Sequence, residues 1–170
     1  MSTLTYTVGD ATDPTIPDDG TVGLILHVTN AQGGWGAGFV LALSRRWPMR
    51  LKERSPEYVY RFGAPDGITL GTCKFVQVEP NLVVVNMCAQ NGFRSAENPV
   101  PLDYKALIQC ILRVQEYIRD VYSRTGVACK VTGPKFGSDL AGGDWSLIEK
   151  ILDRVLVSNV CVDVEIYTLT

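Results

Sequence analysis

The fold follows from one segment, His27-Val-Thr-Asn-Ala-Gln-Gly-Gly-Trp-Gly-Ala-Gly-Phe39. The apolar run before it, 22–26, is typical of a buried strand, and the segment 39–46 after it predicts a helix. Four glycines in this strand-to-helix loop leave backbone N–H groups uncovered, and the helix N-terminus adds a partial positive charge. The segment therefore indicates a phosphate or diphosphate site; a tight turn without a ligand is the alternative.

A second glycine-rich loop repeats this layout. It is Gly133-Pro-Lys-Phe-Gly-Ser-Asp-Leu-Ala-Gly-Gly-Asp-Trp145, between a strand predicted at 129–132 and a helix predicted at 146–155. Ligands of α/β sheets bind where the strands end, so two such loops at one edge can hold the two halves of a diphosphate. Two ordinary strand-to-helix connections are the alternative, but Gly137, Gly142 and Gly143 are more glycines than a connection needs.

The rest of the chain alternates strands and helices. The pattern predicts strands at 4–8, 22–29, 72–78, 82–89 and 160–168, helical segments at 38–46 and 49–55, and loops at 13–20 and 61–67. Apolar residues recur at helical spacing at 107, 108, 111, 114, 118 and 121, which predicts a long helix over 102–124, capped by Asp103 and stopped at Gly126. This order predicts a mainly parallel sheet with helices on both faces, in one domain spanning residues 1–170.

The composition excludes several classes of protein. The net charge is −2 and there is no basic run, so a stable nucleic-acid footprint is not expected. No apolar run is long enough for a membrane span and no signal-peptide pattern opens the chain, so we expect a cytoplasmic protein with no membrane partner. Five cysteines, mostly in apolar contexts, predict buried free thiols. One histidine and no close cysteine pair argue against a metal site, and we expect no cofactor.

Five motifs are spread over nearly the whole chain. They are Val8-Gly-Asp10-Ala-Thr12, His27-Val-Thr-Asn30 with Gly36-Ala-Gly38, Asn86-Met-Cys-Ala-Gln90, Pro134-Lys-Phe-Gly137 with Gly142-Gly-Asp-Trp145, and Val164-Glu-Ile-Tyr-Thr-Leu169. In this order they resemble the macro domains, which bind ADP-ribose. They are most similar to the branch that holds terminal ADP-ribose protein glycohydrolases and the yeast- and phage-type ADP-ribose 1″-phosphate phosphatases. The resemblance implies a three-layer α/β/α sandwich around a mixed, mostly parallel sheet.

The resemblance also implies a set of residues that bind ADP-ribose. Asp10 would accept a hydrogen bond from the adenine amino group, Ala11 would offer its N–H to the base, and Asn30 would face the distal ribose. A turn cap at Asp10 and an Asx-type turn at Asn30 are the alternatives. The full expected set is Gly9, Asp10, Ala11, Asn30, Gly34, Trp35, Gly36, Ala37, Gly38, Phe39, Gln90, Lys135, Phe136, Gly137, Ser138, Asp139, Leu140, Ala141, Gly142 and Leu169.

Asp139, His27 and Asn30 are the candidate catalytic residues. Asp139 would be the general base for a water that attacks C1″; the catalytic aspartate of related glycohydrolases falls at Ala141, so Asp139 is assigned by its neighbourhood only. Phosphatases of the branch resemble this chain at His27, for which a hydrogen-bonded core residue is the alternative. The glycohydrolase lysine falls near Arg94, and because arginine stays protonated, we expect direct attack by water.

These features lead to three functional hypotheses. The first is a hydrolase acting at C1″ that removes mono-ADP-ribose from a protein carboxylate or a nucleobase. The second is an ADP-ribose 1″-phosphate phosphatase, and the third is a non-catalytic ADP-ribose reader. In each case the expected partner is ADP-ribose or an ADP-ribosylated substrate, and the protein is expected to be a monomer.

Overall fold

The computed structural model describes residues 1–33, 37–48 and 69–170, and it contains one six-stranded sheet. The strands, in the spatial order β1-β6-β5-β2-β4-β3, are parallel except for β3, which pairs with β4 antiparallel. Their bounds are β1 Leu4–Val8, β2 Val22–Asn30, β3 Cys73–Glu79, β4 Leu82–Gln90, β5 Cys129–Gly133 and β6 Val164–Thr168. The predicted mixed, mostly parallel sheet is confirmed.

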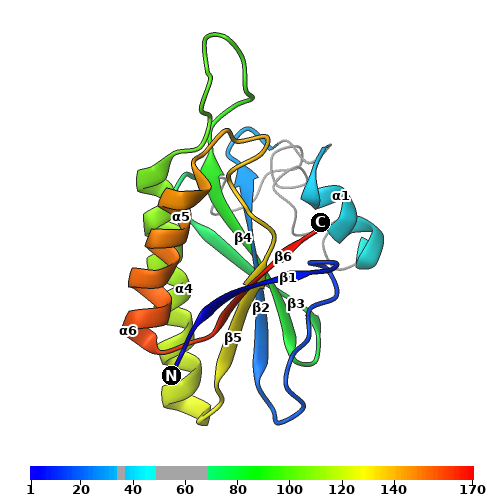
Figure 1. The fold of residues 1–170 in the computed structure, drawn as a ribbon, viewed down its shortest axis with the longest axis vertical. Helices are drawn as coiled ribbons and strands as arrows, with labels where there is room; N and C mark the ends of the chain where they lie inside the picture. Colours follow the sequence, from blue (N-terminus) through cyan, green and yellow to red (C-terminus); the bar gives the residue numbers. More distant parts are fainter. Residues whose placement is uncertain (34–36, 49–68) are drawn as a thin grey trace.

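Helices cover the sheet on both faces, as Figure 1 shows. One face carries α4 (Tyr104–Thr125), α5 (Trp145–Leu152), a π-helical turn (Asp153–Val157) and α6 (Ser158–Val160), and the other face carries α1 (Phe39–Arg46). The larger apolar core lies between the sheet and α4–α6; the smaller one lies beneath α1 and includes Val40 and Leu43. The predicted three-layer α/β/α sandwich is therefore confirmed.

The ends of α4 agree with the sequence prediction to within two residues. Asp103 caps the helix, since its side chain accepts a hydrogen bond from the Ala106 N–H, and Gly126 ends it in a left-handed conformation. The apolar positions of the predicted pattern face the core, but Ile108 is an exception that remains exposed. Ile108 follows Leu107 by one residue, which on an α-helix turns its side chain by about 100° away from the core.

The segment from 145 to 163 differs from the prediction. Helical structure continues beyond 155 to Val160, and the last strand begins at Val164 rather than at 160. Gln115 of α4 donates a hydrogen bond to the carbonyl of Val155, which compensates the irregular helical bonding of the π-turn. Cys161 then leaves the helix with a φ of 55°. It is also exposed, contrary to the expectation that the cysteines are buried.

Other segment predictions fall within a residue or two of the observed elements. The predictions for 49–55 and 61–67 lie outside the described residues. Within the part of the chain that the structure describes, no helix is long and apolar enough to cross a membrane.

Candidate functional site

A cleft of about 930 Å³ opens where the parallel strands end. Its lining comes from the segments that follow β1, β2, β4, β5 and β6, which are five neighbouring strands of the sheet. It contains His27 and all the predicted ADP-ribose ligands within the described residues except Gly142. Gly34, Trp35 and Gly36 lie outside the described residues. Because adjacent strands are about 4.8 Å apart, a cleft across five strands suits a long, thin ligand.

The first glycine loop leads directly into α1. Gly38, with a φ of 80° and a ψ of −149°, is the N-cap residue, and no side chain of a described residue caps the helix. The start of α1 can therefore offer backbone N–H groups to an anion, although the Leu41 N–H already donates to the Gly38 carbonyl. A Cβ atom at Gly38 would lie 3.0 Å from Cδ1 of Leu140, so the second glycine loop meets the first at this point.

In the second loop, two glycines are needed for close packing of the backbone, and not only for access to the cleft. A Cβ atom at Gly143 would lie 2.5 Å from the carbonyl oxygen of Gly137, and one at Gly142 would lie 2.8 Å from that of Pro99. The following helix, α5, is already capped, because Asp144 accepts hydrogen bonds from the N–H and hydroxyl of Ser146. The two loops are thus not equivalent, and α1 offers the open helix N-terminus.

Asp10 is exposed at the β1 side of the cleft. Its Oδ1 accepts hydrogen bonds of 2.8 Å from both the N–H and the hydroxyl of Thr12. The backbone and side-chain hydrogen bonds from Thr12 hold the pKa of Asp10 below its ordinary value, so the side chain is a carboxylate at neutral pH. The turn cap and the ligand role are compatible, since Oδ2 has no hydrogen-bond partner among the described residues.

Asn30 forms the Asx-type turn that was the alternative to a ribose contact. Its Oδ1 accepts from the N–H groups of Gln32 (3.0 Å) and Gly92 (3.1 Å), and its Nδ2 donates to the carbonyl of Gly92 (2.8 Å). The side chain therefore fixes the loop after β4 to the end of β2. Since an amide nitrogen carries two N–H groups, one further hydrogen bond toward a ligand is possible.

His27 lies at the bottom of the cleft, where only 2% of its surface is exposed. Its Nε2 is hydrogen-bonded to Oδ1 of Asn86, and its ring centroid lies 5.8 Å from that of Phe39. Burial lowers the pKa of His27 to about 4, in spite of the opposing effect of the hydrogen bond that its ring makes to Oδ1 of Asn86. The imidazole is consequently neutral at neutral pH.

Around the second loop, Asp139 is exposed and lines the cleft, whereas Ala141 is buried beside it. Phe136 is also buried and meets the Trp145 ring edge-on at a centroid distance of 5.5 Å, so it packs the loop onto the sheet. Arg94, which the sequence places near the glycohydrolase lysine, lines the cleft too.

Other residues of the lining were not among the predicted ligands. Thr29 is 2% exposed, and its hydroxyl has no hydrogen-bond partner among the described residues. Phe93 is 64% exposed at the mouth of the cleft, and Tyr167 forms part of its wall. The one sequence signal for Thr29 is strand alternation, which puts residues 27 and 29 on the same face of β2. In the described part of the chain, no cluster of three His, Cys, Asp or Glu residues could hold a metal ion.

The chain matches no protein-family model and no curated protein, but solved structures resemble it over nearly its full length. A Bacteroides thetaiotaomicron protein of unknown function is 33% identical, with 98% of this chain and 99% of that chain covered and a TM-score of 0.82. The DarTG protein of Thermosipho africanus, solved in complex with ADP-ribose, shares the fold at 15% identity. The match covers 98% of this chain and 42% of that chain, with a TM-score of 0.62. A macrodomain protein from Streptomyces coelicolor is 34% identical, with 98% of this chain and 99% of that chain covered and a TM-score of 0.77. At this identity and coverage, the chain belongs to the macrodomain family.

Proposed function

We propose that this macrodomain binds ADP-ribose in the cleft and hydrolyses the bond between C1″ and an attached acceptor. The observation that supports it best is the order of groups along the cleft. The Asp10 carboxylate lies at the β1 side and suits the adenine amino group, and the uncapped N-terminus of α1 suits the diphosphate. The segment after β4, which carries Arg94, lies on the other side of β2 from Asp10 and remains for the distal ribose and its acceptor. The loop after β5, which carries Asp139, also lines the cleft and meets the first glycine loop at Gly38.

In the proposed reaction, water attacks C1″ and gives up a proton to the Asp139 carboxylate. The bond between C1″ and the acceptor atom breaks, and its electron pair leaves with the acceptor, which is then protonated. The exposed position of Asp139 supports this role because a general base must reach both water and substrate. Arg94 stays protonated and does not act as a nucleophile, but its charge suits an anionic acceptor or leaving group.

A reader function without turnover is the second candidate, and particular residues favour it. Ala141, where the catalytic aspartate of related glycohydrolases falls, is buried and has no group to activate water. Asn30 is engaged with the backbone of Gly92 and Gln32, and His27 is buried and neutral. If Asp139 does not act as a base, these residues leave binding as the function.

The test is turnover of glutamate-linked ADP-ribose, thymidine-linked ADP-ribose and ADP-ribose 1″-phosphate side by side, with calorimetry of free ADP-ribose. We expect one-to-one binding in the micromolar range, which corresponds to about −7 to −9 kcal/mol. Release of ADP-ribose from either linked substrate supports the hydrolase. Release of phosphate alone points to the phosphatase, and binding without turnover points to the reader. No binding heat at millimolar ADP-ribose rejects the whole proposal.

A further inference from the structure

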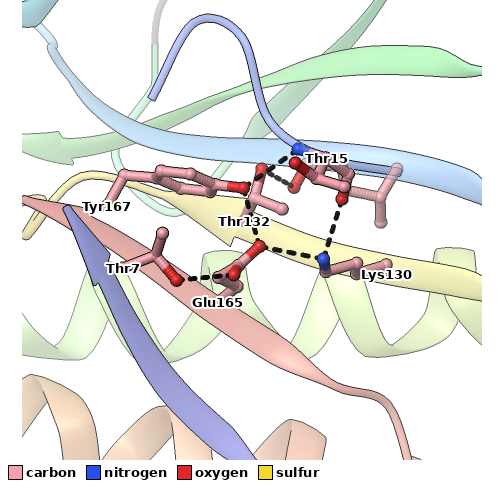
Figure 2. A network of polar contacts seen from close by, with 7 residues as sticks. Thr7, Thr15, Lys130, Thr132, Glu165 and Tyr167 are labelled. Carbon is pink, nitrogen blue, oxygen red and sulfur yellow. Dashed lines mark hydrogen bonds and ion pairs between the residues drawn. The ribbon is translucent and has the colours of Figure 1, made fainter. Parts of the chain in front are cut away.

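A network of polar side chains lies on the α1 face of the sheet, beside the β1 side of the cleft. It comprises Thr7 of β1, Lys130 and Thr132 of β5, and Glu165 and Tyr167 of β6, and it surrounds the backbone of Thr15, as Figure 2 shows. Thr7 pairs with Tyr167 in the register of the sheet, and Thr132 pairs with Glu165. Side chains on the opposite face of these strands, such as Val131 and Ile166, belong to the apolar core. These strands therefore have an apolar face toward the larger core and a polar face on the α1 side (Figure 2).

The network holds both backbone polar groups of Thr15. The Tyr167 hydroxyl accepts a hydrogen bond from the Thr15 N–H (2.9 Å) and donates one to Oε1 of Glu165 (2.7 Å). Lys130 Nζ donates to the Thr15 carbonyl (2.8 Å) and to the same Glu165 oxygen (2.9 Å). Thr7 donates to Oε2 of Glu165 (2.7 Å). Glu165 thus fixes the two groups, Tyr167 and Lys130, that hold the loop (Figure 2).

The same network reaches the cleft through the Tyr167 ring. A Cβ atom at Gly9 would lie 3.3 Å from Cδ1 of this ring, and the Gly9 N–H donates to the carbonyl of Thr168 (2.9 Å). The segment 9–15 is therefore attached to β6 at its start through Gly9 and at its end through Thr15. Asp10, whose carboxylate is proposed to accept a hydrogen bond from the adenine amino group, lies inside this segment.

The cost of the network suggests a role other than stability. The side chains of Lys130 and Glu165 are only 19% and 18% exposed, and removing both charges from water costs about as much as their attraction returns. Burial by itself raises the pKa of Glu165, but hydrogen bonds from Thr7, Tyr167 and Lys130 together hold it below its ordinary value. A partly buried ion pair of this kind can contribute specificity by favouring one loop geometry over others.

We propose that Glu165 and Lys130 are positioning residues that set the base selectivity of the cleft. They hold Tyr167 and the segment 9–15 so that the Asp10 carboxylate faces the exocyclic amine of adenine. This inference rests on the proposed ADP-ribose function. It adds that selectivity for adenine over a base without that amine depends on side chains that never touch the base.

The test compares the affinities of ADP-ribose and its hypoxanthine analogue, which has a carbonyl oxygen in place of the amine. Calorimetry is run on the wild type, Tyr167→Phe, Lys130→Met and Glu165→Gln. Tyr167→Phe keeps the ring and loses the hydroxyl, and Lys130→Met keeps the length of the side chain and loses its hydrogen bonds. The matched control is Arg124→Met, which removes an exposed ion pair with Asp120 on α4.

We expect a wild type that prefers ADP-ribose, and a preference that falls about three- to tenfold in Tyr167→Phe and Lys130→Met. Glu165→Gln keeps an acceptor oxygen for Tyr167 and Lys130, and it should retain more of the preference than either variant. Arg124→Met should not change it. Melting temperatures show whether each variant is folded; if Tyr167→Phe does not fold, Lys130→Met decides.

Equal losses of affinity for both ligands, or an unchanged ratio in the folded variants, would overturn the inference while the proposed function stands. A wild type that binds ADP-ribose without base preference overturns it too. A wild type that binds neither ligand rejects the proposed function itself, and the inference with it.

Discussion

At the scale of single residues, the two oxygens of the Asp10 carboxylate have different tasks. Oδ1 closes the turn with Thr12, and Oδ2 has no hydrogen-bond partner among the described residues, so it is available to a ligand. A residue type with two equivalent acceptors allows both at once. From the sequence alone the turn and the ligand contact are alternatives, because a single sequence does not show which oxygen meets which donor.

Asp10→Asn separates these tasks. Asparagine keeps one acceptor oxygen for the Thr12 turn but presents an N–H donor where the second oxygen was, and that donor faces the adenine amine. We expect the affinity for ADP-ribose to fall by about 1.5–3 kcal/mol, and the loss for the hypoxanthine analogue to be smaller because its base accepts there. Calorimetry with both ligands measures the difference; equal affinities in mutant and wild type would move adenine recognition to another residue.

Asp139→Ala tests the general base. If Asp139 activates water, turnover of the best substrate should fall about 10²–10⁴-fold while ADP-ribose affinity changes little, because the base acts mainly on water. Asp120→Ala, an exposed carboxylate on α4, is the control for loss of one negative charge. Single-turnover kinetics and calorimetry are measured on the same preparations. Unchanged turnover removes Asp139 from the mechanism, and joint loss of binding and turnover makes it a ligand contact.

At the scale of elements, two loops with the same layout in sequence differ in the structure. The helix after the first loop begins at Gly38 without a side-chain cap, whereas α5 begins at Asp144, which caps it. The position of Asp144 directly before the helix predicted at 146–155 is typical of such a cap. The close approach of Gly143 to Gly137 and Leu102 could not be predicted, because it depends on how the loop folds back on itself.

Leu140→Ala tests the contact between the two loops. Leu140 is 51% exposed, lines the cleft and lies close to Gly38 at the start of α1. Removing its side chain should weaken ADP-ribose binding by about 1 kcal/mol, about fivefold, mainly through faster dissociation. Leu147→Ala, which shortens an exposed leucine on α5, is the matched control. Stopped-flow dissociation rates check this; equal rates in both variants would mean that Leu140 does not cover the ligand.

At the scale of the whole molecule, the alternation of strands and helices was sufficient to predict the layers and the mostly parallel sheet. Local patterns also predicted where α4 begins and ends, because capping residues act on their own neighbours. The polar network could not be predicted in this way. Thr7 and Glu165 are 158 residues apart in the sequence, and only the register between β1 and β6 brings them together.

At the same scale, the free energy of unfolding should depend on pH through the single histidine, His27. His27 has a pKa of about 4 in the folded protein against 6.5 for an exposed histidine, because burial disfavours its charged form. Between these values the unfolded chain binds a proton that the folded protein does not, so stability is complete above pH 6.5 and falls as the pH approaches 4. From pH 7 to pH 5 the expected loss is about 2 kcal/mol.

Asp10 and Glu165 also have lowered pKa values, but their ordinary values of 3.8 and 4.5 lie below pH 5, so they contribute little to the change between pH 7 and pH 5. Urea unfolding at pH 7 and pH 5 measures the loss, and His27→Gln should remove most of it whatever its effect on stability at pH 7. Since the chain has one histidine, a single imidazole signal in the proton NMR spectrum reports its titration directly. A midpoint near 6.5 in the folded protein would show that His27 is solvated, which would restore it as a candidate acid or base near neutral pH.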